Sequence, residues 1–223
     1  PDYASPGKMA QIEAYGAHLH PIPGPRERAA QAARQAARGG YYASHYWNPL
    51  PLEGIKTEAY EIAETLDWRA PDNVILPVGQ GTHLLGLYRG FHDLLKANII
   101  VKMPHLYGVQ ARVCAPLYEA FWGREETVET KRTVAEGISI RQPIHGKGIL
   151  EAVRATQGEF LAVREEEILQ ARHLLALKGL YVEPTSAVPV AALKGVRARL
   201  SPGEITVIPL TGSGLKGVSP RQL

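Results

Sequence analysis

A short apolar run that breaks at a pair of glycines constrains the fold of this chain most. Residues 74–78 are apolar and β-branched at both ends, which is typical of a buried strand. Apolar residues then recur at helical spacing over residues 83–95, so a helix is predicted there. Gly79 and Gly81 lie at the joint, where glycines allow a sharp turn and bring backbone N–H groups to the helix N-terminus. The sequence therefore predicts a phosphate site at this loop.

Two nucleotide-binding loops with related glycine patterns are disfavoured. A dinucleotide fingerprint requires glycine where this chain has Leu84. A Walker loop requires lysine followed by serine or threonine, where this chain has His83 and Leu84. One structural alternative stays open for the loop taken alone, because glycine is common at any strand-to-helix turn of an α/β protein.

Composition indicates a protein that can bury a sizeable core, as one large domain or as one and a half. The chain has 223 residues, of which 45% are hydrophobic. The net charge of +3 comes from 25 basic and 22 acidic residues that are interspersed. A mild basic cluster, Arg26, Arg28, Arg34 and Arg38, contains no interleaved aromatic residues, so it is interpreted as a solvated helix face. No nucleic-acid partner is expected.

The single cysteine and the lack of long apolar runs bear on the cellular location of the protein and on its partners. Cys114 has no partner for an internal disulfide and is compatible with a reducing cytosol, so a cytoplasmic location is expected. No apolar run approaches about 18 residues and no signal-peptide pattern opens the chain, so no membrane partner is expected. No metal site is assigned.

Helical and strand patterns alternate along most of the chain. An extended piece is expected at 135–140 and a polar loop at 123–132. Such alternation predicts an α/β fold with a mostly parallel sheet that has helices on both faces. Ligands of such sheets lie beyond the carboxyl ends of the strands, and a second glycine-rich loop, 211–214, follows the last predicted strand. The predicted helices are 8–15, 27–38, 58–66, 83–95, 113–121, 146–156, 165–177 and 184–199, and the predicted strands are 17–22, 74–78, 99–103, 160–163 and 205–210.

The first 24 residues form a helix and a strand for which the sequence offers no adjacent strand. An isolated strand needs a sheet to satisfy its hydrogen bonds. Apolar side chains here are expected to pack poorly or to recruit another chain, as is the aromatic segment 41–47, so a homo-oligomer is expected. The apolar side chains concerned are Met9, Ile12, Tyr15, Leu19 and Ile22.

Five short motifs occur in a distinctive order. They are Glu53-Gly-Ile-Lys-Thr57, Pro77-Val-Gly-Gln-Gly81, Ala135-Glu-Gly-Ile138, Glu183-Pro-Thr-Ser-Ala187 and Leu210-Thr-Gly-Ser-Gly-Leu-Lys216. In this order the chain resembles the C-terminal two thirds of threonine synthase, within the fold-type-II pyridoxal-phosphate (PLP) enzymes. The resemblance implies the tryptophan synthase β-like fold, with a partial small domain. Residues 1–47 would be a remnant of the smaller N-terminal domain and its connection, and residues 48–223 the large PLP-binding domain.

The resemblance also implies cofactor-binding residues. Gly79, Gln80, Gly81 and Thr82 match the loop that holds the PLP phosphate through backbone N–H groups. Thr211 matches a hydroxyl that lies against the pyridine nitrogen of PLP. A neutral hydroxyl leaves that nitrogen largely unprotonated, which suits elimination and replacement chemistry. An alternative for Thr211 is a turn residue that caps its own loop.

The catalytic lysine of the family has no counterpart here. Fold-type-II enzymes hold PLP as a Schiff base to a lysine in a Ser-Phe-Lys-like motif, upstream of the residues that match Pro1. The chain contains no such motif and begins with proline rather than methionine, so its true start is expected elsewhere. Lys8 and Lys56 match other family positions and are not expected to replace that lysine. The chain alone is therefore expected to be a truncated and inactive form of the enzyme.

The substrate is expected to differ from that of threonine synthase. Most of the family's clamp for the phosphate of O-phosphohomoserine is replaced, by His45, Tyr46, Pro51 and His83. His45, Tyr46 and His83 remain candidate substrate-binding residues, although lone histidines more often serve packing or capping.

Two functions are compatible with this pattern. The first is part of a PLP-dependent lyase of amino-acid metabolism that performs elimination or replacement at the β or γ carbon of an amino acid. The alternative is a non-catalytic fragment or subunit that binds a phosphate-bearing ligand or a partner protein.

Overall fold

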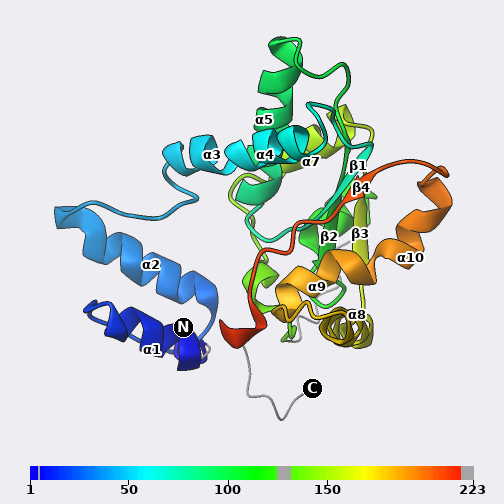
Figure 1. Cartoon of the computed structure of the whole chain (residues 1–223). Helices are drawn as coiled ribbons and strands as arrows, with labels where there is room; N and C mark the ends of the chain where they lie inside the picture. The colour runs from blue at the N-terminus through cyan, green and yellow to red at the C-terminus, as the bar shows by residue number, and fades with distance from the viewer. Residues whose placement is uncertain (5, 125–131, 217–223) are drawn as a thin grey trace.

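The computed structural model of the chain describes residues 1–4, 6–124 and 132–216 (Figure 1). Its strands form one parallel sheet in the order β3-β2-β1-β4. Asn73 at the start of the central strand lies opposite both His105 and Thr206. The predicted α/β class is therefore confirmed. The strands are β1 (Asn73–Pro77), β2 (His105–Ala111), β3 (Phe160–Val163) and β4 (Thr206–Val207).

Helices cover both faces of this sheet, as the sequence pattern predicted. The side chains of α4, α5 and α7 pack on one face, and those of α8, α9 and α10 pack on the other. The helices are α1 (Pro6–Ala14), α2 (Arg26–Ala36), α3 (Leu50–Ile55), α4 (Thr57–Thr65), α5 (Thr82–Lys96), α6 (Pro116–Phe121), α7 (Gly146–Ala155), α8 (Glu165–Leu177), α9 (Pro184–Ala191) and α10 (Leu193–Val196).

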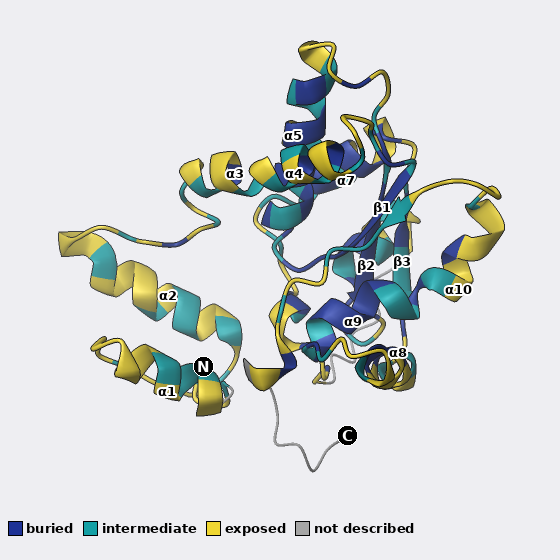
Figure 2. Ribbon diagram, viewed as in Figure 1, coloured by how far each residue is buried: buried dark blue, intermediate teal, exposed yellow. Residues whose placement is uncertain are grey.

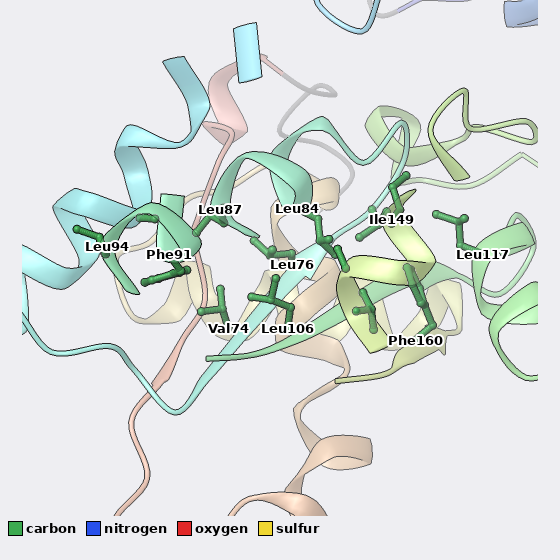
Figure 3. Close-up of a cluster of buried hydrophobic side chains, with 14 of the residues drawn as sticks. Val74, Leu76, Leu84, Leu87, Phe91, Leu94, Leu106, Leu117, Ile149 and Phe160 are labelled. Carbon is green, nitrogen blue, oxygen red and sulfur yellow. The ribbon is translucent and has the colours of Figure 1, made fainter. Parts of the chain in front are cut away.

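The alternation of side chains along β1 divides the core into two clusters. Val74 and Leu76 belong to the cluster beneath α5 and α7, together with Phe91 (Figure 3). Ile75, one residue away, belongs to the cluster beneath α8 and α9. Successive residues of a strand face opposite sides, so a strand buried on both faces is apolar throughout. Each fully buried aliphatic side chain stabilises the fold by about 2 kcal/mol.

The order of the strands places a crevice at the carboxyl ends of β1 and β4. The chain passes from β1 to β2 and then to β3 on one side, whereas β4 pairs with the other side of β1. Such a reversal of strand order opens a crevice at which ligands bind. The two glycine-rich loops, 79–81 and 211–214, follow β1 and β4, so both lie at this crevice.

Polar side chains at the amino end of β1 fix the short strand β4 in place. The Asp72 carboxylate accepts a hydrogen bond from the Ile205 amide at 2.8 Å and pairs with Lys102. The Lys102 hydrogen bond, with that of Ile205, lowers the pKa of the Asp72 carboxyl. Asn73 Nδ2 donates to Glu204 Oε2 at 2.9 Å. These bonds hold the segment that leads to Thr211 beside β1.

The predicted strand 99–103 is wrong. The second strand is instead β2, and Val101 is 94% exposed in the turn before it. Residues 99–101 are apolar and β-branched. Strand pairing nevertheless decides the register: Asn73 pairs with His105, and Gly108 leaves room for Phe160 on the neighbouring strand. A local apolar run does not contain that information.

Other predicted boundaries are corrected by local geometry. The expected extended piece 135–140 contains a 3₁₀ turn at Glu136–Ile138. The expected helix 184–199 divides into α9, α10 and a 3₁₀ turn, with Pro189 inside α9. The expected helix 113–121 begins only at Pro116, and the expected strand 205–210 pairs only at Thr206–Val207. Most of the expected polar loop 123–132 lies outside the described residues.

The N-terminal segment contributes little to the core. Residues 17–22 form no strand, which corrects that prediction, because no strand in the described part of the chain lies beside them to accept their hydrogen bonds. Tyr15 is 78% exposed, and α1 and α2 carry mostly exposed and half-buried residues (Figure 2). Neither core cluster includes a described residue from 1–47.

Candidate functional site

A cavity of about 940 Å³ lies at the carboxyl ends of β1 and β4. Each of the five sequence motifs contributes to its lining, through Ile55, Pro77, Ile138, Thr185 and Thr211 among others. The structure therefore brings together segments that are far apart in the sequence. The lining also includes every predicted site residue: His45, Tyr46, Gly79, Gln80, Gly81, Thr82, His83 and Thr211.

The loop after β1 offers a row of free hydrogen-bond donors to this cavity. Gly81 is the residue before α5 and has a left-handed backbone, with φ of 78°. In the described part of the chain, the N–H groups of Gly79, Gln80 and Gly81 donate to no protein acceptor. The first N–H groups of α5 also lack intrahelical partners by helix geometry. Together with the helix dipole, this arrangement favours an anion.

Neighbouring segments hold the loop in this conformation. The Gln80 side chain accepts a hydrogen bond from the Ile144 amide at 3.1 Å. At Gly79 an added Cβ would lie only 3.0 Å from Ile138 Cα, so the loop packs directly against the 3₁₀ turn. Gly137 in that turn donates to Thr185 Oγ1 at 3.2 Å. Three of the motifs are therefore connected by contacts at the cavity wall.

The hydroxyl of Thr211 is oriented by a buried serine. Ser186 Oγ accepts a hydrogen bond from the Gly212 amide at 2.7 Å and lies 3.1 Å from Thr211 Oγ1. If Ser186 donates to Thr211, the Thr211 proton is free to point into the cavity. Ser186 is fully buried, and sequence reasoning did not single it out although it lies in the motif 183–187.

The three candidate substrate residues have different environments. His83 Nε2 lies 2.7 Å from Glu58 Oε2, so this ring is paired with a carboxylate. His45 is exposed and makes an edge contact with Tyr46, at 4.8 Å between ring centroids. The Tyr46 carbonyl lies 2.9 Å from His145 Nε2, which anchors this segment to the start of α7.

Helix α2 supplies a charged wall that the sequence did not reveal. Arg26, Glu27, Ala30 and Arg34 line the cavity, although this face was predicted to be simply solvated. Their spacing of three to four residues is that of one helix face. Glu58 and Glu61 of α4 were missed in the same way, because a surface helix rich in charges gives no sign of what it faces.

None of the described residues that line the cavity is a lysine. Lys56 forms ion pairs outside the cavity lining, with its amine 2.6 Å from Glu53 and 2.8 Å from Asp93. The hydrogen bonds that this amine donates to Asp93 and Glu53 raise its pKa above the ordinary value of 10.5, so it stays protonated. The Lys8 amine lies 3.6 Å from Glu183. A protonated, paired amine is a poor nucleophile.

Metal clusters and membrane-spanning helices are both absent from residues 1–4, 6–124 and 132–216. No group of three or more His, Cys, Asp or Glu residues there is arranged to hold a metal ion. No helix in the same ranges has both the length and the apolar character needed to cross a bilayer.

A parallel α/β fold with a glycine-rich anion cradle at the carboxyl edge of its sheet defines a class of phosphate-binding proteins. Residues 1–212 match the family model described as pyridoxal-phosphate dependent enzyme. The chain therefore belongs to the PLP-dependent enzyme family, and the predicted resemblance and cofactor are confirmed.

Curated relatives agree with this assignment. The threonine synthase of Methanocaldococcus jannaschii is 36% identical over 217 residues, which cover 94% of this chain and 54% of that protein. The threonine synthase of Mycobacterium bovis is 36% identical over 218 residues, which cover 94% of this chain and 58% of that protein. The chain thus spans about half the length of the curated relatives it matches.

Solved structures share the fold. The threonine deaminase of T.th. has a TM-score of 0.72 and 26% identity, and the match covers 96% of this chain and 68% of that one. Maize serine racemase has a TM-score of 0.74 at 19% identity, covering 100% of this chain and 66% of that one, which shows the fold alone.

Proposed function

We propose that this chain forms the part of a PLP-dependent lyase that binds the cofactor phosphate and the ring nitrogen. The enzyme would perform elimination or replacement at the β or γ carbon of an amino acid other than O-phosphohomoserine. One observation supports this most: the loop at 79–82 and Thr211 line one cavity, at the end of the sheet where ligands bind. Residues 1–47 are proposed as a remnant of a smaller domain, and 48–223 as the large domain.

The loop would hold the phosphate without a cationic side chain. The unbonded N–H groups of Gly79, Gln80 and Gly81 and the first turn of α5 supply several donors. Hydrogen bonds to a charged group contribute about 1.5–3 kcal/mol each. The left-handed backbone at Gly81 orients these donors, so the cradle is formed before the ligand arrives.

Thr211 would meet the ring nitrogen and set the electronic character of the site. When bound, PLP supplies an electron-accepting ring. The Thr211 hydroxyl lies 3.1 Å from Ser186 Oγ and carries no charge, and it would donate to the ring nitrogen when Ser186 donates to Thr211. A neutral donor leaves the nitrogen unprotonated, which favours loss of a leaving group over the more extensive delocalisation that a carboxylate partner promotes.

The amine that holds the cofactor and moves the proton would come from outside the described cavity lining. Lys8 and Lys56, which match other positions of the family, each form an ion pair with a carboxylate. The residues of this chain would then bind, orient and shield the reacting group.

Reductive labelling tests this function. The full-length gene product and the 223-residue chain are incubated with PLP, reduced with borohydride and mapped by peptide mass spectrometry. We expect a pyridoxyl group on one lysine of the full-length protein and none on Lys8 or Lys56 of either protein. Lys147, whose side chain is 91% exposed, reports non-specific labelling. Stoichiometric labelling of Lys56, or no binding of PLP by the full-length protein, would contradict the proposal.

A second candidate is a non-catalytic subunit that binds a phosphate-bearing ligand or a partner protein. The lack of lysine among the described lining residues favours it. The intact mass of the gene product distinguishes the two, because a much longer polypeptide supports the enzyme and a native start near Pro1 supports the subunit.

Location and assembly are also proposals. Cys114 is buried and free, as suits a reducing cytoplasm. Tyr15, Tyr41 and Trp47 are largely exposed, as suits burial in a homo-oligomer. Light scattering on the full-length protein measures the mass of the assembly and so tests the homo-oligomer.

A further inference from the structure

The wall of the cavity beside the anion-binding loop is acidic. Thr57, Glu58 and Glu61 line the cavity from α4. His83, in the first turn of α5, lies 2.7 Å from Glu58 through Nε2 and Oε2. This contact holds the Glu58 carboxylate against a side chain of the first turn of α5, the helix whose N-terminus would bind the cofactor phosphate.

Carboxylate oxygens on α4 remain able to accept hydrogen bonds from a ligand. Among the described residues, Glu58 Oε1 and the Glu61 side chain have no hydrogen-bond partner. A carboxylate only accepts hydrogen bonds, so a ligand group that approaches this wall must donate. The Glu58 side chain is 35% exposed and that of His83 is 21% exposed, so the pair is accessible but partly shielded from solvent screening.

The cationic side chains of the cavity lie on another element. Arg26 and Arg34 belong to α2, which also contributes Glu27. The Arg34 guanidinium stacks over Trp47, at 5.6 Å from the ring centroid. A group placed against α4 would meet Glu58 and Glu61, whereas Arg26 and Arg34 line the same cavity from α2.

We propose that Glu58, positioned by His83, determines substrate specificity by selecting an amino acid with an uncharged, hydroxyl-bearing side chain. Its carboxylate accepts a hydrogen bond from the hydroxyl group and repels a phosphate or a carboxylate at the same place. This selection rests on the proposed function, because it requires the amino acid to enter this cavity. His83 acts as a positioning residue.

A matched pair of ligands tests the selection. The full-length protein, loaded with PLP, is titrated with L-homoserine and with O-phospho-L-homoserine, which differ only by the phosphate. We expect L-homoserine to bind about tenfold more tightly than O-phospho-L-homoserine. The Glu58 carboxylate and the ligand phosphate carry like charges, which repel strongly at a few ångströms in a partly shielded site. Glu58→Gln, nearly identical in shape, is expected to reduce this ratio by about tenfold.

Glu64→Gln is the control, since Glu64 is exposed on α4 and does not line the cavity. It should leave the ratio unchanged, and circular dichroism checks that both variants fold. Glu58→Asp, which keeps the charge, should retain the preference for L-homoserine. A wild-type preference for the phosphorylated ligand, or the same ratio in Glu58→Gln as in Glu64→Gln, would overturn the specificity role. Normal PLP loading with an unchanged ratio in Glu58→Gln removes only the role of Glu58. A wild-type preference for O-phospho-L-homoserine would also contradict the proposed substrate but not the cofactor site, whereas failure to load PLP removes both proposals.

Discussion

Gly81→Val is expected to abolish PLP binding and to destabilise the protein. Gly81 has φ of 78°, and an added Cβ would lie 2.2 Å from Ile149 Cδ1. The left-handed backbone costs a non-glycine residue roughly 1–2 kcal/mol. The collision with the core adds about 1–3 kcal/mol. Relaxation to another backbone conformation would turn the N–H groups of the loop away from the cavity, so the phosphate loses its donors.

Urea unfolding and a PLP titration monitored by visible absorbance measure the two effects separately. Gly148→Ala is the matched control, because Gly148 lies in α7 beside Ile149 and an added Cβ meets nothing within 4 Å. It should increase stability by about 0.5–1 kcal/mol and leave binding unchanged. A Gly81→Val protein that binds PLP as tightly as the parent would show that this loop does not hold the phosphate.

Gly90→Val is expected to have the largest effect on stability alone. Gly90 lies where α5 crosses the start of α4, and an added Cβ would lie 2.3 Å from the Lys56 carbonyl oxygen and 2.6 Å from Ala59 Cβ. A backbone oxygen cannot move aside as a side chain can. We expect the free energy of unfolding to fall by about 3 kcal/mol or more, because the two helices must separate to admit the side chain.

Gly54→Ala is the control for this prediction. Gly54 lies in α3, and an added Cβ meets nothing within 4 Å. Alanine there should raise stability by about 0.5–1 kcal/mol through the lower entropy of the unfolded chain. If Gly90→Val unfolds at the same urea concentration as the parent, the close crossing of α4 and α5 is incorrect.

The strand, loop and helix around Gly81 could be predicted because their signals are local. The apolar run at 74–78, the glycine pair and the spacing of Leu84, Leu87 and Phe91 each specify one structure. Their agreement explains why β1 and α5 differ from the predicted boundaries by only one residue. The gathering of the five motifs in one cavity required more, namely the resemblance to a family in which they occur in this order.

Structural features that depend on contacts between residues far apart in the sequence could not be predicted from local patterns. The strand predicted at 99–103 begins with three apolar, β-branched residues, as a true strand can, and only pairing with Asn73 identifies β2. The role of α2 as a cavity wall and the contact between Glu58 and His83 depend on how helices are placed in space. Charged residues on a helix give the same pattern whether they face solvent or a ligand.

The loop 79–82 is proposed to hold the phosphate of PLP, and a comparison of the affinities of PLP and pyridoxal for the protein tests this role. The two ligands differ only by the phosphate, so their affinities for the purified protein isolate its contribution. Two charge-assisted hydrogen bonds correspond to roughly 3 kcal/mol, so PLP should bind about a hundredfold more tightly, and inorganic phosphate should compete with it. Equal affinity for the two ligands, with no competition by phosphate, would show that this loop does not hold the phosphate.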